Sequence, residues 1–249
     1  ISLSLMNLEW LDKKINIIDT PGYLDFHGEV KSAMSAADFA AIVVSATESI
    51  DVGTELCWEY SDKEFKIPKL FIISMADKDQ SDYDSVLSAL KTRYGRTVFP
   101  FTLPVNESPG FNQIADVLRK ETFTFETNGS GNYSEAAAEG DWAQKLENYH
   151  NELIELIAES DENLLELFFD KGELSEAELR SGLHQALKSG GLIPVFCVSG
   201  EKNTGVKRMM DILAKYAPCA GDFEEVVGTK PGSDEEVIHG PLVNDPLAA

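Results

Sequence analysis

The sequence predicts an α/β fold in which a mostly parallel sheet carries helices on both faces. Four short apolar runs are the first observation, because each has the length of a buried strand and is bounded by turn or breaker residues. Helical patterns between the runs are the second, since this alternation is typical of parallel strands joined by crossover helices. The runs are residues 15–18, 40–44, 69–73 and 193–198.

A long segment of different character separates the third and fourth runs, and it predicts an inserted α+β subdomain. Residues 111–125 alternate in places and favour a hairpin, while residues 128–132 favour a flexible loop. Apolar residues then recur at helical spacing, which predicts three helices packed into a core. The third helix opens with the capping box formed by Ser175 and Glu178.

These patterns predict four segments along the chain. Residues 1–103 and 191–220 form one sheet-based core, and residues 104–190 form the inserted acidic subdomain. Residues 221–249 contain acidic pairs, Gly and Pro, and they favour a linker to a second domain. The chain starts inside a strand-like stretch without an initiator Met, so we expect it to be truncated at its N-terminus.

Composition and charge argue against a membrane-spanning protein and against a broad nucleic-acid-binding surface. With 249 residues, of which 43% are hydrophobic, the chain can bury a sizeable core. Its net charge of -22 argues against a broad nucleic-acid-binding face, because acidic surfaces repel phosphate. No apolar run approaches the roughly 20 residues that span a bilayer, and no signal peptide is evident. Three widely spaced cysteines show neither metal spacing nor a disulfide framework, so we expect a cytoplasmic protein without a membrane partner.

The most specific motif is Asp19-Thr20-Pro21-Gly22, directly after the first apolar run. A carboxylate at the C-terminal end of a parallel strand lies where α/β sheets bind ligands, and it can hold a Mg²⁺-bound water there. The flexible turn lets the Gly22 N–H approach a terminal phosphate. The alternative is a plain strand-to-helix turn with Asp19 as an N-cap. The helical stretch at residues 29–35 favours the phosphate site.

Two further loops follow strands in the same way. Asp77 comes four residues after Ile73, and one carboxylate can accept both the ring N–H and the exocyclic amino group of guanine. The alternative is a surface Asp in a loop. Residues 199–203 follow the last run, and their backbone N–H groups can meet the carbonyl of a base. The three loops together predict one nucleotide site along a single rim of the sheet.

At these motifs the sequence resembles the GTPase domain of the elongation factor G family. Residues 15–22 match the strand and second switch of that family, and residues 194–199 with 202–206 match its last base-binding loop and helix. Residues 245–249 match the start of its second, barrel domain, and the acidic insert matches its extra subdomain. The resemblance implies a P-loop-NTPase-like fold, with GTP or GDP and Mg²⁺ as cofactors and the ribosome as partner.

The resemblance also implies roles for individual residues and a function, GTP-dependent ribosomal translocation during protein synthesis. It places Gly22 and Tyr23 at the catalytic position and Asp19 on Mg²⁺ through water. The residues it assigns to GTP binding are Asp19, Thr20, Pro21, Gly22, Ser74, Met75, Asp77, Ser199, Gly200 and Glu201.

Three departures from the family pattern bear on activity. Tyr23 stands where the catalytic factors have His, and a phenol is neutral at pH 7. Ser74-Met75-Ala76-Asp77 replaces Asn-Lys-x-Asp, so Asp77 carries most of the guanine preference. No Gly-x-x-x-x-Gly-Lys-Ser/Thr loop occurs in the 249 residues, and that loop supplies much of phosphate binding in such enzymes. We therefore expect this polypeptide alone to bind GTP weakly and to hydrolyse none.

The departures favour a diverged elongation factor G-like paralogue and leave alternatives open. One is a ribosome-binding, GTP-dependent factor with weak or no hydrolysis, which Tyr23 and Met75 favour. Another is a ribosomal protection or release-type translational GTPase. A scaffold that binds no nucleotide is the remaining class.

Overall fold

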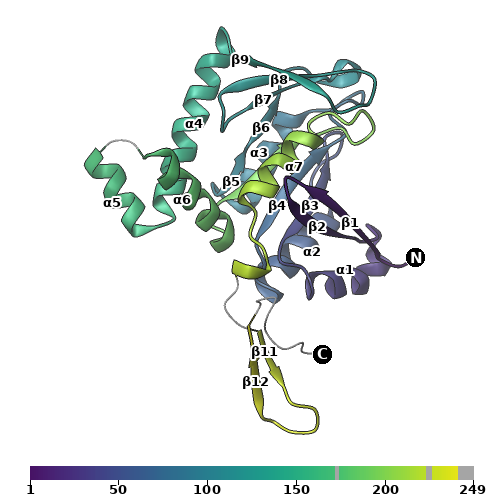
Figure 1. The fold of residues 1–249 in the computed structure, drawn as a ribbon. Coiled ribbons are helices and arrows are strands. Elements are labelled where there is room, and N and C mark those ends of the chain that lie inside the picture. Colours follow the sequence, from purple (N-terminus) through teal and green to yellow (C-terminus); the bar gives the residue numbers. More distant parts are fainter. Residues whose placement is uncertain (172–173, 223–225, 241–249) are drawn as a thin grey trace.

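The computed structural model describes residues 1–171, 174–222 and 226–240, and its centre is a four-stranded sheet (Figure 1). The strand order is β3-β4-β10-β5, and every neighbouring pair runs parallel. These strands are β3 (Ala40–Ser45), β4 (Lys69–Ser74), β5 (Val98–Pro100) and β10 (Ile193–Cys197). Three of the four predicted parallel strands and the α/β fold are therefore confirmed.

The prediction for the first apolar run is wrong in one respect. Residues 15–18 lie in β2 (Lys13–Asp19), which pairs antiparallel with β1 (Ser4–Trp10) and is only partly buried. Leu11 and Asp12 form the two-residue turn with φ values of 47° and 59°. Turns with positive φ at both central residues match the twist of a hairpin, so the run pairs with the strand beside it in sequence.

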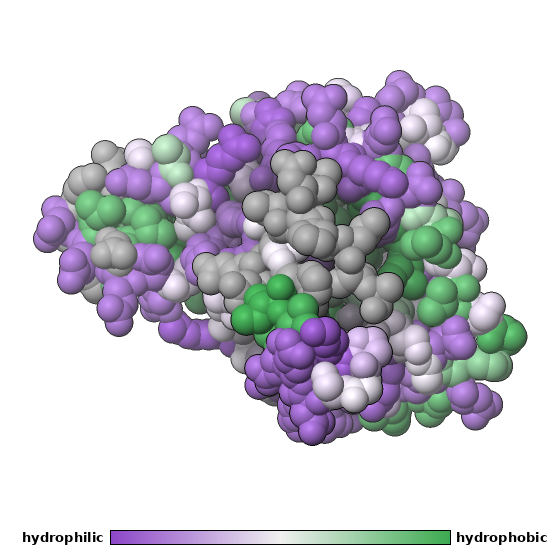
Figure 2. Space-filling view, turned by 60° about the horizontal axis from the view of Figure 1, so that its bottom comes forward, coloured by the Kyte–Doolittle hydropathy of each residue, from purple (hydrophilic) through white to green (hydrophobic). Residues whose placement is uncertain are grey.

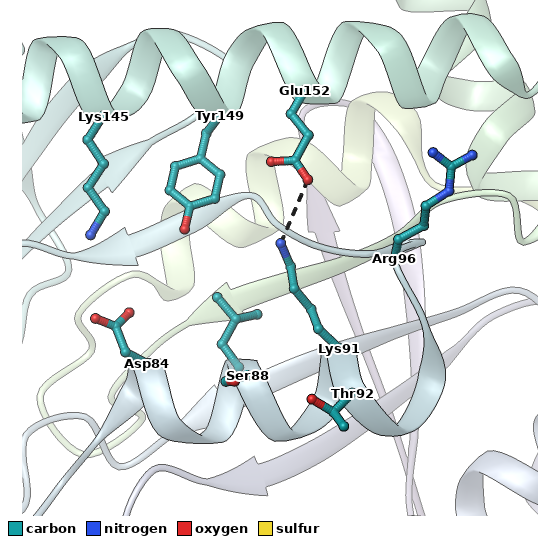
Figure 3. A pocket seen from close by; sticks show the side chains of 9 residues that line it. Asp84, Ser88, Lys91, Thr92, Arg96, Lys145, Tyr149 and Glu152 are labelled. Atoms are coloured by element: carbon teal, nitrogen blue, oxygen red, sulfur yellow. Dashed lines mark ion pairs between the residues drawn. The ribbon is translucent and has the colours of Figure 1, made fainter.

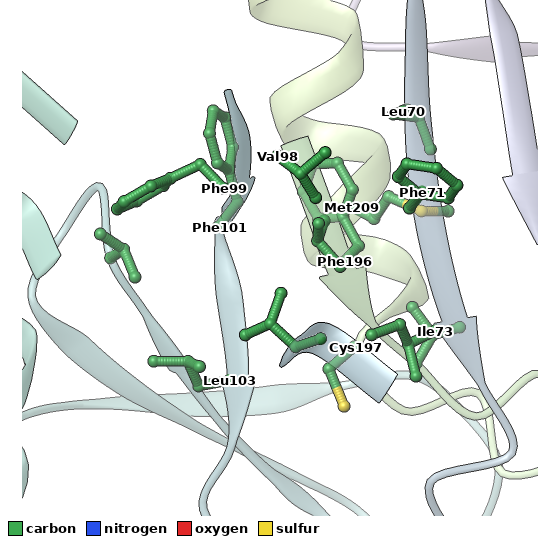
Figure 4. Packing of buried hydrophobic residues seen from close by; sticks show 14 of the residues in the cluster. Leu70, Phe71, Ile73, Val98, Phe99, Phe101, Leu103, Phe196, Cys197 and Met209 are labelled. Carbon is green, nitrogen blue, oxygen red and sulfur yellow. The ribbon is translucent and has the colours of Figure 1, made fainter. Parts of the chain in front are cut away.

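Helices cover both faces of the central sheet (Figure 1). On one face, the Phe71 ring stacks against Trp58 at 5.9 Å and Tyr94 at 5.5 Å between ring centroids. On the other face, Met209 of the covering helix belongs to the same buried cluster as Phe196 (Figure 4). Because β10 is buried along its whole length, its apolar run does not alternate. The covering helices are α2 (Val52–Glu59), α3 (Tyr83–Tyr94) and α7 (Val206–Tyr216).

Strand β3 is open along one edge and on one face. Ala40, Ile42 and Val44 are buried, whereas Ala41 and Val43 are exposed, Val43 by 61%. Among the described strands, β3 pairs with β4 alone and β2 pairs with β1 alone. The hairpin of β1 and β2 therefore lies outside the central sheet.

The inserted unit confirms the predicted hairpin, the three helices and the Ser175–Glu178 capping box. Its antiparallel sheet has the order β6-β7-β8-β9 and starts at Thr102, just before the expected boundary. The strands are β6 (Thr102–Pro104), β7 (Gln113–Asp116), β8 (Glu121–Phe125) and β9 (Tyr133–Ala137). The helices are α4 (Asp141–Glu159), α5 (Glu162–Lys171) and α6 (Glu176–Ser189).

The remaining helices are short. Helix α1 (His27–Met34) follows the hairpin and contains most of the predicted stretch at residues 29–35. The single-turn elements are η1 (Leu24–Phe26), η2 (Tyr60–Glu64), η3 (Ser108–Gly110) and η4 (Ala220–Asp222). None of the described helices has the length and apolar character needed to cross a membrane.

The C-terminal segment contains a hairpin that projects from the body (Figure 1). Strands β11 (Val226–Thr229) and β12 (Glu236–His239) pair antiparallel, so part of the predicted linker is regular structure. The match at residues 245–249 lies outside the described residues. Viewed towards this hairpin, the surface is mostly hydrophilic, and hydrophobic side chains gather on the side of the N-terminus (Figure 2). Ile1 and Leu5 are 80% and 70% exposed there.

Candidate functional site

The loops that follow β4 and β10 lie side by side at one edge of the central sheet. The register pairs Cys197 with Ile73, so both strands end at the same level. The Val198 N–H donates to the Ile73 carbonyl oxygen at 3.0 Å, and the Ala76 N–H donates to the Val198 carbonyl oxygen at 3.5 Å. Two of the three predicted ligand loops are thus brought together at the carboxyl end of parallel strands, where α/β proteins bind ligands.

Asp77 in the first of these loops is buried and weakly paired. It is 5% exposed, so it is not the surface residue of the alternative interpretation. Its carboxylate accepts no hydrogen bond from the described part of the chain, and its nearest cation there is the Lys78 ammonium, Nζ to Oδ2 3.8 Å. The carboxylate oxygens are not among the fully buried unpaired atoms of the described residues, so they remain open to a ligand that brings N–H groups.

The residues before Asp77 shape its loop. Ser74 ends β4 and is half-buried. Met75 is 47% exposed and has a φ of 64°, a left-handed conformation that side chains other than Gly seldom adopt. The Lys78 N–H donates to the Met75 carbonyl oxygen at 3.0 Å, which closes a tight turn. The turn leaves the Met75 side chain in solvent, where it can lie along a flat ligand.

The loop after β10 is a closed turn. Ser199 and Thr204 exchange backbone hydrogen bonds, from the Ser199 N–H at 2.9 Å and from the Thr204 N–H at 3.0 Å. The Ser199 hydroxyl, fully buried, accepts from the Lys202 N–H at 3.1 Å. Gly200 is exposed at the tip, with open space around it. The turn therefore presents backbone at its tip while its base is fixed.

An ion pair spans the two loops. The Lys78 ammonium donates to the Glu201 carboxylate, so the loop after β4 is tied to the loop after β10. This hydrogen bond, with the charge of Glu201, raises the pKa of Lys78 above its ordinary value. Both side chains are exposed, so the pair holds the loops in register more than it stabilises the fold.

The Asp19 loop lies apart from this pair. Asp19 ends β2 and is exposed, Thr20 and Pro21 are half-buried, and Gly22 has open space around it. Tyr23 is 73% exposed. No hydrogen bond or ion pair between described residues joins this segment to the other two loops. The structure therefore brings Asp77 and Ser199 together but leaves Asp19 at the end of the hairpin, so the predicted single rim is found here for two of the three loops.

The hairpin that carries Asp19 is anchored at both ends. At its tip, the Trp10 indole N–H donates to Oδ1 of Asp211 in α7 at 2.9 Å. At its open end, the Leu3 N–H donates to Oε2 of Glu29 in α1 at 2.9 Å. Asp19 pairs with Ser4 at this open end. The strand end that carries Asp19 is therefore held next to α1, which follows the Asp19 loop after the single turn η1.

Sequence reasoning missed Thr102, which joins the strand before the last loop to the inserted sheet. Its hydroxyl accepts from the Cys197 N–H at 2.8 Å, and its carbonyl oxygen accepts from the Tyr83 hydroxyl at 2.9 Å. Burial raises the pKa of both the Tyr83 phenol and the Cys197 thiol, so both stay neutral. Thr102 belongs to no motif, and nothing in its local pattern distinguishes it.

Of the two cavities described, the smaller, about 220 Å³, borders the Ser199 turn, because Asn203 lines it together with Trp10 and Lys207. The larger, about 570 Å³, is an open groove between α3 and α4 (Figure 3). Two of its cations are paired with carboxylates, because Lys91 faces Glu152 at 4.0 Å and Arg96 pairs with Glu159, and the third, Lys145, lies over the Trp142 ring. A search of residues 1–171, 174–222 and 226–240 finds no cluster of three or more His, Cys, Asp or Glu that would hold a metal alone.

Comparison with known proteins gives three findings. Residues 1–219 match the family described as the elongation factor Tu GTP-binding domain. The whole chain is 29% identical to elongation factor G 2 of Syntrophus aciditrophicus (strain SB) and covers 37% of that protein. A crystal structure of a Thermus thermophilus protein superposes with a TM-score of 0.82 at 26% identity, over 96% of this chain and 36% of that one. The chain thus spans a little over a third of the length of these relatives.

Proposed function

The chain belongs to the elongation factor Tu GTP-binding domain family, and from this membership we propose that it is the guanine-nucleotide-binding domain of a ribosomal translocation factor. Its likeness to elongation factor G 2 along its whole length, insert included, supports that type of translational GTPase. In the proposed protein, GTP hydrolysis on the ribosome promotes the movement of tRNA and mRNA. The observation that carries the proposal is the buried Asp77 carboxylate beside the Ser199 turn.

Asp77 reads the base in this proposal. Guanine offers a ring N–H and an amino group side by side, and one carboxylate accepts both. Adenine lacks this pair of donors. Ser74 and Met75 lie along the base, and backbone at Ser199, Gly200 and Glu201 meets the guanine carbonyl. Asp77 accepts no hydrogen bond from the described residues and its oxygens are not fully buried, so its carboxylate is free to accept both N–H groups of guanine.

Asp19 is suited to Mg²⁺ held partly by the nucleotide. Mg²⁺ keeps several waters and is bound in such sites by one or two carboxylates and substrate phosphates. The exposed Asp19 carboxylate at a strand end fits this donor set, whereas a cage made of protein alone would need a cluster that the described residues lack. The cation neutralises phosphate charge when bound. Asp19 would hold it through water, and the Gly22 N–H would meet the γ-phosphate.

Loss of the γ-phosphate then releases the segment from Thr20 to Glu29. This segment runs from the Asp19 turn into α1, and Glu29 holds the open end of the hairpin. Segments that are ordered by a γ-phosphate and released on hydrolysis are a known type of switch. We propose that the complete factor transmits this change to its partner, the cytoplasmic ribosome.

A second function, nucleotide-dependent ribosome binding without appreciable hydrolysis, is favoured by one observation. Tyr23 directly follows Gly22, is 73% exposed and donates to no described residue. A neutral phenol is a poor general base at pH 7. Release of inorganic phosphate from the complete factor, with and without ribosomes, separates the two functions. Stimulated release supports hydrolysis, and binding without release supports the alternative.

The base-recognition step is tested by changing Asp77 to Asn in the complete factor. An amide accepts from the ring N–H but donates to the neighbouring position, so it suits xanthine, which has a carbonyl where guanine has its amino group. We expect Asp77→Asn to lose GDP affinity and to gain affinity for xanthosine diphosphate, measured by competition against a fluorescent nucleotide. The exposed Asp79→Asn is the matched control and should retain the parent preference. Unchanged guanine selectivity in Asp77→Asn would exclude this role.

A further inference from the structure

The first loop of the inserted unit, residues 105–112, contacts both loops of the candidate base site. It connects β6 to β7 and is internally braced by the Asn106 side chain. The Asn106 amide donates to the Gly110 carbonyl oxygen at 2.5 Å, and its Oδ1 accepts from the Gln113 N–H at 3.1 Å. These hydrogen bonds therefore hold the loop in one defined conformation.

One contact fixes the peptide that precedes Asp77. The Ser108 N–H donates to the Ala76 carbonyl oxygen at 3.0 Å, and the Ser81 hydroxyl donates to the same oxygen at 3.2 Å. A peptide unit is planar, so the Ala76 carbonyl and the Asp77 N–H share one plane. Two donors on the Ala76 oxygen hold that plane, and with it the direction in which the Asp77 side chain leaves the backbone.

The same loop also holds the neighbouring elements. The Glu107 carboxylate accepts from the N–H of Tyr83, the first residue of α3, at 3.0 Å. On the other side, the Lys202 ammonium donates to the Pro109 carbonyl oxygen. Consecutive residues of the insert therefore contact the helix after the Asp77 loop, the Asp77 loop itself and the Ser199 turn.

A second loop of the insert reaches the Ser199 turn from β8 and β9. The Asn203 amide donates to the Gly129 carbonyl oxygen at 3.3 Å. Gly131 lies so close that a Cβ there would come within 2.6 Å of the Asn203 Nδ2. The turn is thus held by the insert at Lys202 and at Asn203, two consecutive residues that follow its tip.

We propose that the insert positions the base-recognition loops, with Ser108 and Lys202 as positioning residues that set the selectivity for guanine. This inference rests on the proposed role of Asp77 in base recognition. A part that merely stabilises the fold would change affinity for all nucleotides alike. A part that orients the Asp77 carboxylate changes the preference for guanine over hypoxanthine. Hypoxanthine lacks the exocyclic amino group from which the carboxylate accepts a hydrogen bond.

The test compares the affinities of the complete factor for GDP and inosine diphosphate by competition. Ser81→Ala removes the hydroxyl that donates to the Ala76 carbonyl oxygen, whereas Ser108→Gly keeps the N–H that meets the same oxygen and tolerates the φ of 65° at this position. Lys202→Met removes the ammonium that meets Pro109. Its matched control is Lys120→Met, which removes an exposed ion pair with Glu147 in another part of the insert.

We expect Ser81→Ala and Lys202→Met each to lower the GDP preference by about fivefold, the size of one modest hydrogen bond, while both controls keep it. An unchanged preference in both variants, with the parent still discriminating, overturns the inference. If Ser81→Ala does not fold, Lys202→Met alone decides in the same way. A parent that fails to discriminate the two nucleotides refutes the Asp77 role itself, and the inference with it.

Discussion

Arg208 in α7 donates through Nε to Oδ2 of Asp116 in β7 at 2.6 Å, with both side chains buried. The pair joins the inserted sheet to the helix that follows the Ser199 turn. The other Asp116 oxygen accepts from the Arg119 N–H at 2.8 Å, and the Arg208 guanidinium lies over the Phe123 ring. The ion pair therefore sits among satisfied partners, as buried charges require.

Replacing Asp116 by Ala should be strongly destabilising, because it leaves the Arg208 charge buried without its partner. We expect a loss of about 3–5 kcal/mol in the free energy of unfolding, measured by urea denaturation. Arg119→Ala removes exposed ion pairs with Glu121 and Glu135 and should cost about 1 kcal/mol or less. Equal effects for the two variants would contradict a special role for the buried pair.

Gly205 precedes α7 with a φ of 79°, and a Cβ there would lie 2.5 Å from the Cys197 backbone oxygen. Gly205→Ala should therefore destabilise the protein by about 1–3 kcal/mol, since it combines a left-handed backbone with a contact that only backbone movement can relieve. Gly200→Ala is the control, because Gly200 has open space around it. A thermal melt that shows no difference between the two variants would contradict the geometry at Gly205.

The sequence was sufficient to predict the strands that carry Asp77 and Ser199, because their apolar runs end at polar turns. It could not predict that residues 15–18 pair antiparallel, since an apolar run does not specify the direction of its partner. The sequence also could not predict contacts such as the one between Ser108 and Ala76. They join residues far apart in sequence through backbone groups that every residue possesses, so no side-chain pattern marks them.

Acid should weaken the contact between α6 and the start of the C-terminal segment. His184 contacts the Tyr216 carbonyl oxygen at 3.0 Å and Oδ1 of Asp222 at 2.9 Å, and Oδ2 of Asp222 accepts from the Cys219 N–H at 2.7 Å. Desolvation raises the pKa of Asp222, but the hydrogen bonds from Cys219 and His184 outweigh it and lower that pKa below 3.8. The nearby charge of Asp222 adds to burial in raising the pKa of Asp38.

Because the folded pKa of Asp222 is depressed, its carboxylate contributes stability above the ordinary value of 3.8 and loses it as pH falls through the folded value. We expect Asp222→Asn to be less stable than the parent at pH 5 to 7. The difference in unfolding free energy should shrink below a pH of about 4. Thermal melts over this range measure it, and a difference that grows towards acid would have the wrong sign.

The 249-residue chain by itself should bind GTP weakly and hydrolyse none, because it contains no phosphate-binding loop motif. Isothermal calorimetry with GTP and Mg²⁺ checks this directly. Weak heats and no released phosphate are expected. Micromolar affinity would show that the Asp19, Asp77 and Ser199 loops bind nucleotide without that motif.

The account depends most on one nucleotide contacting three separate loops. Amide hydrogen exchange of the complete factor, with and without GDP and Mg²⁺, measures this segment by segment. We predict simultaneous protection at residues 19–22, 74–78 and 199–203, with the groove between α3 and α4 unchanged. Protection confined to one of these segments, or appearing in that groove instead, would contradict a single guanine-nucleotide site.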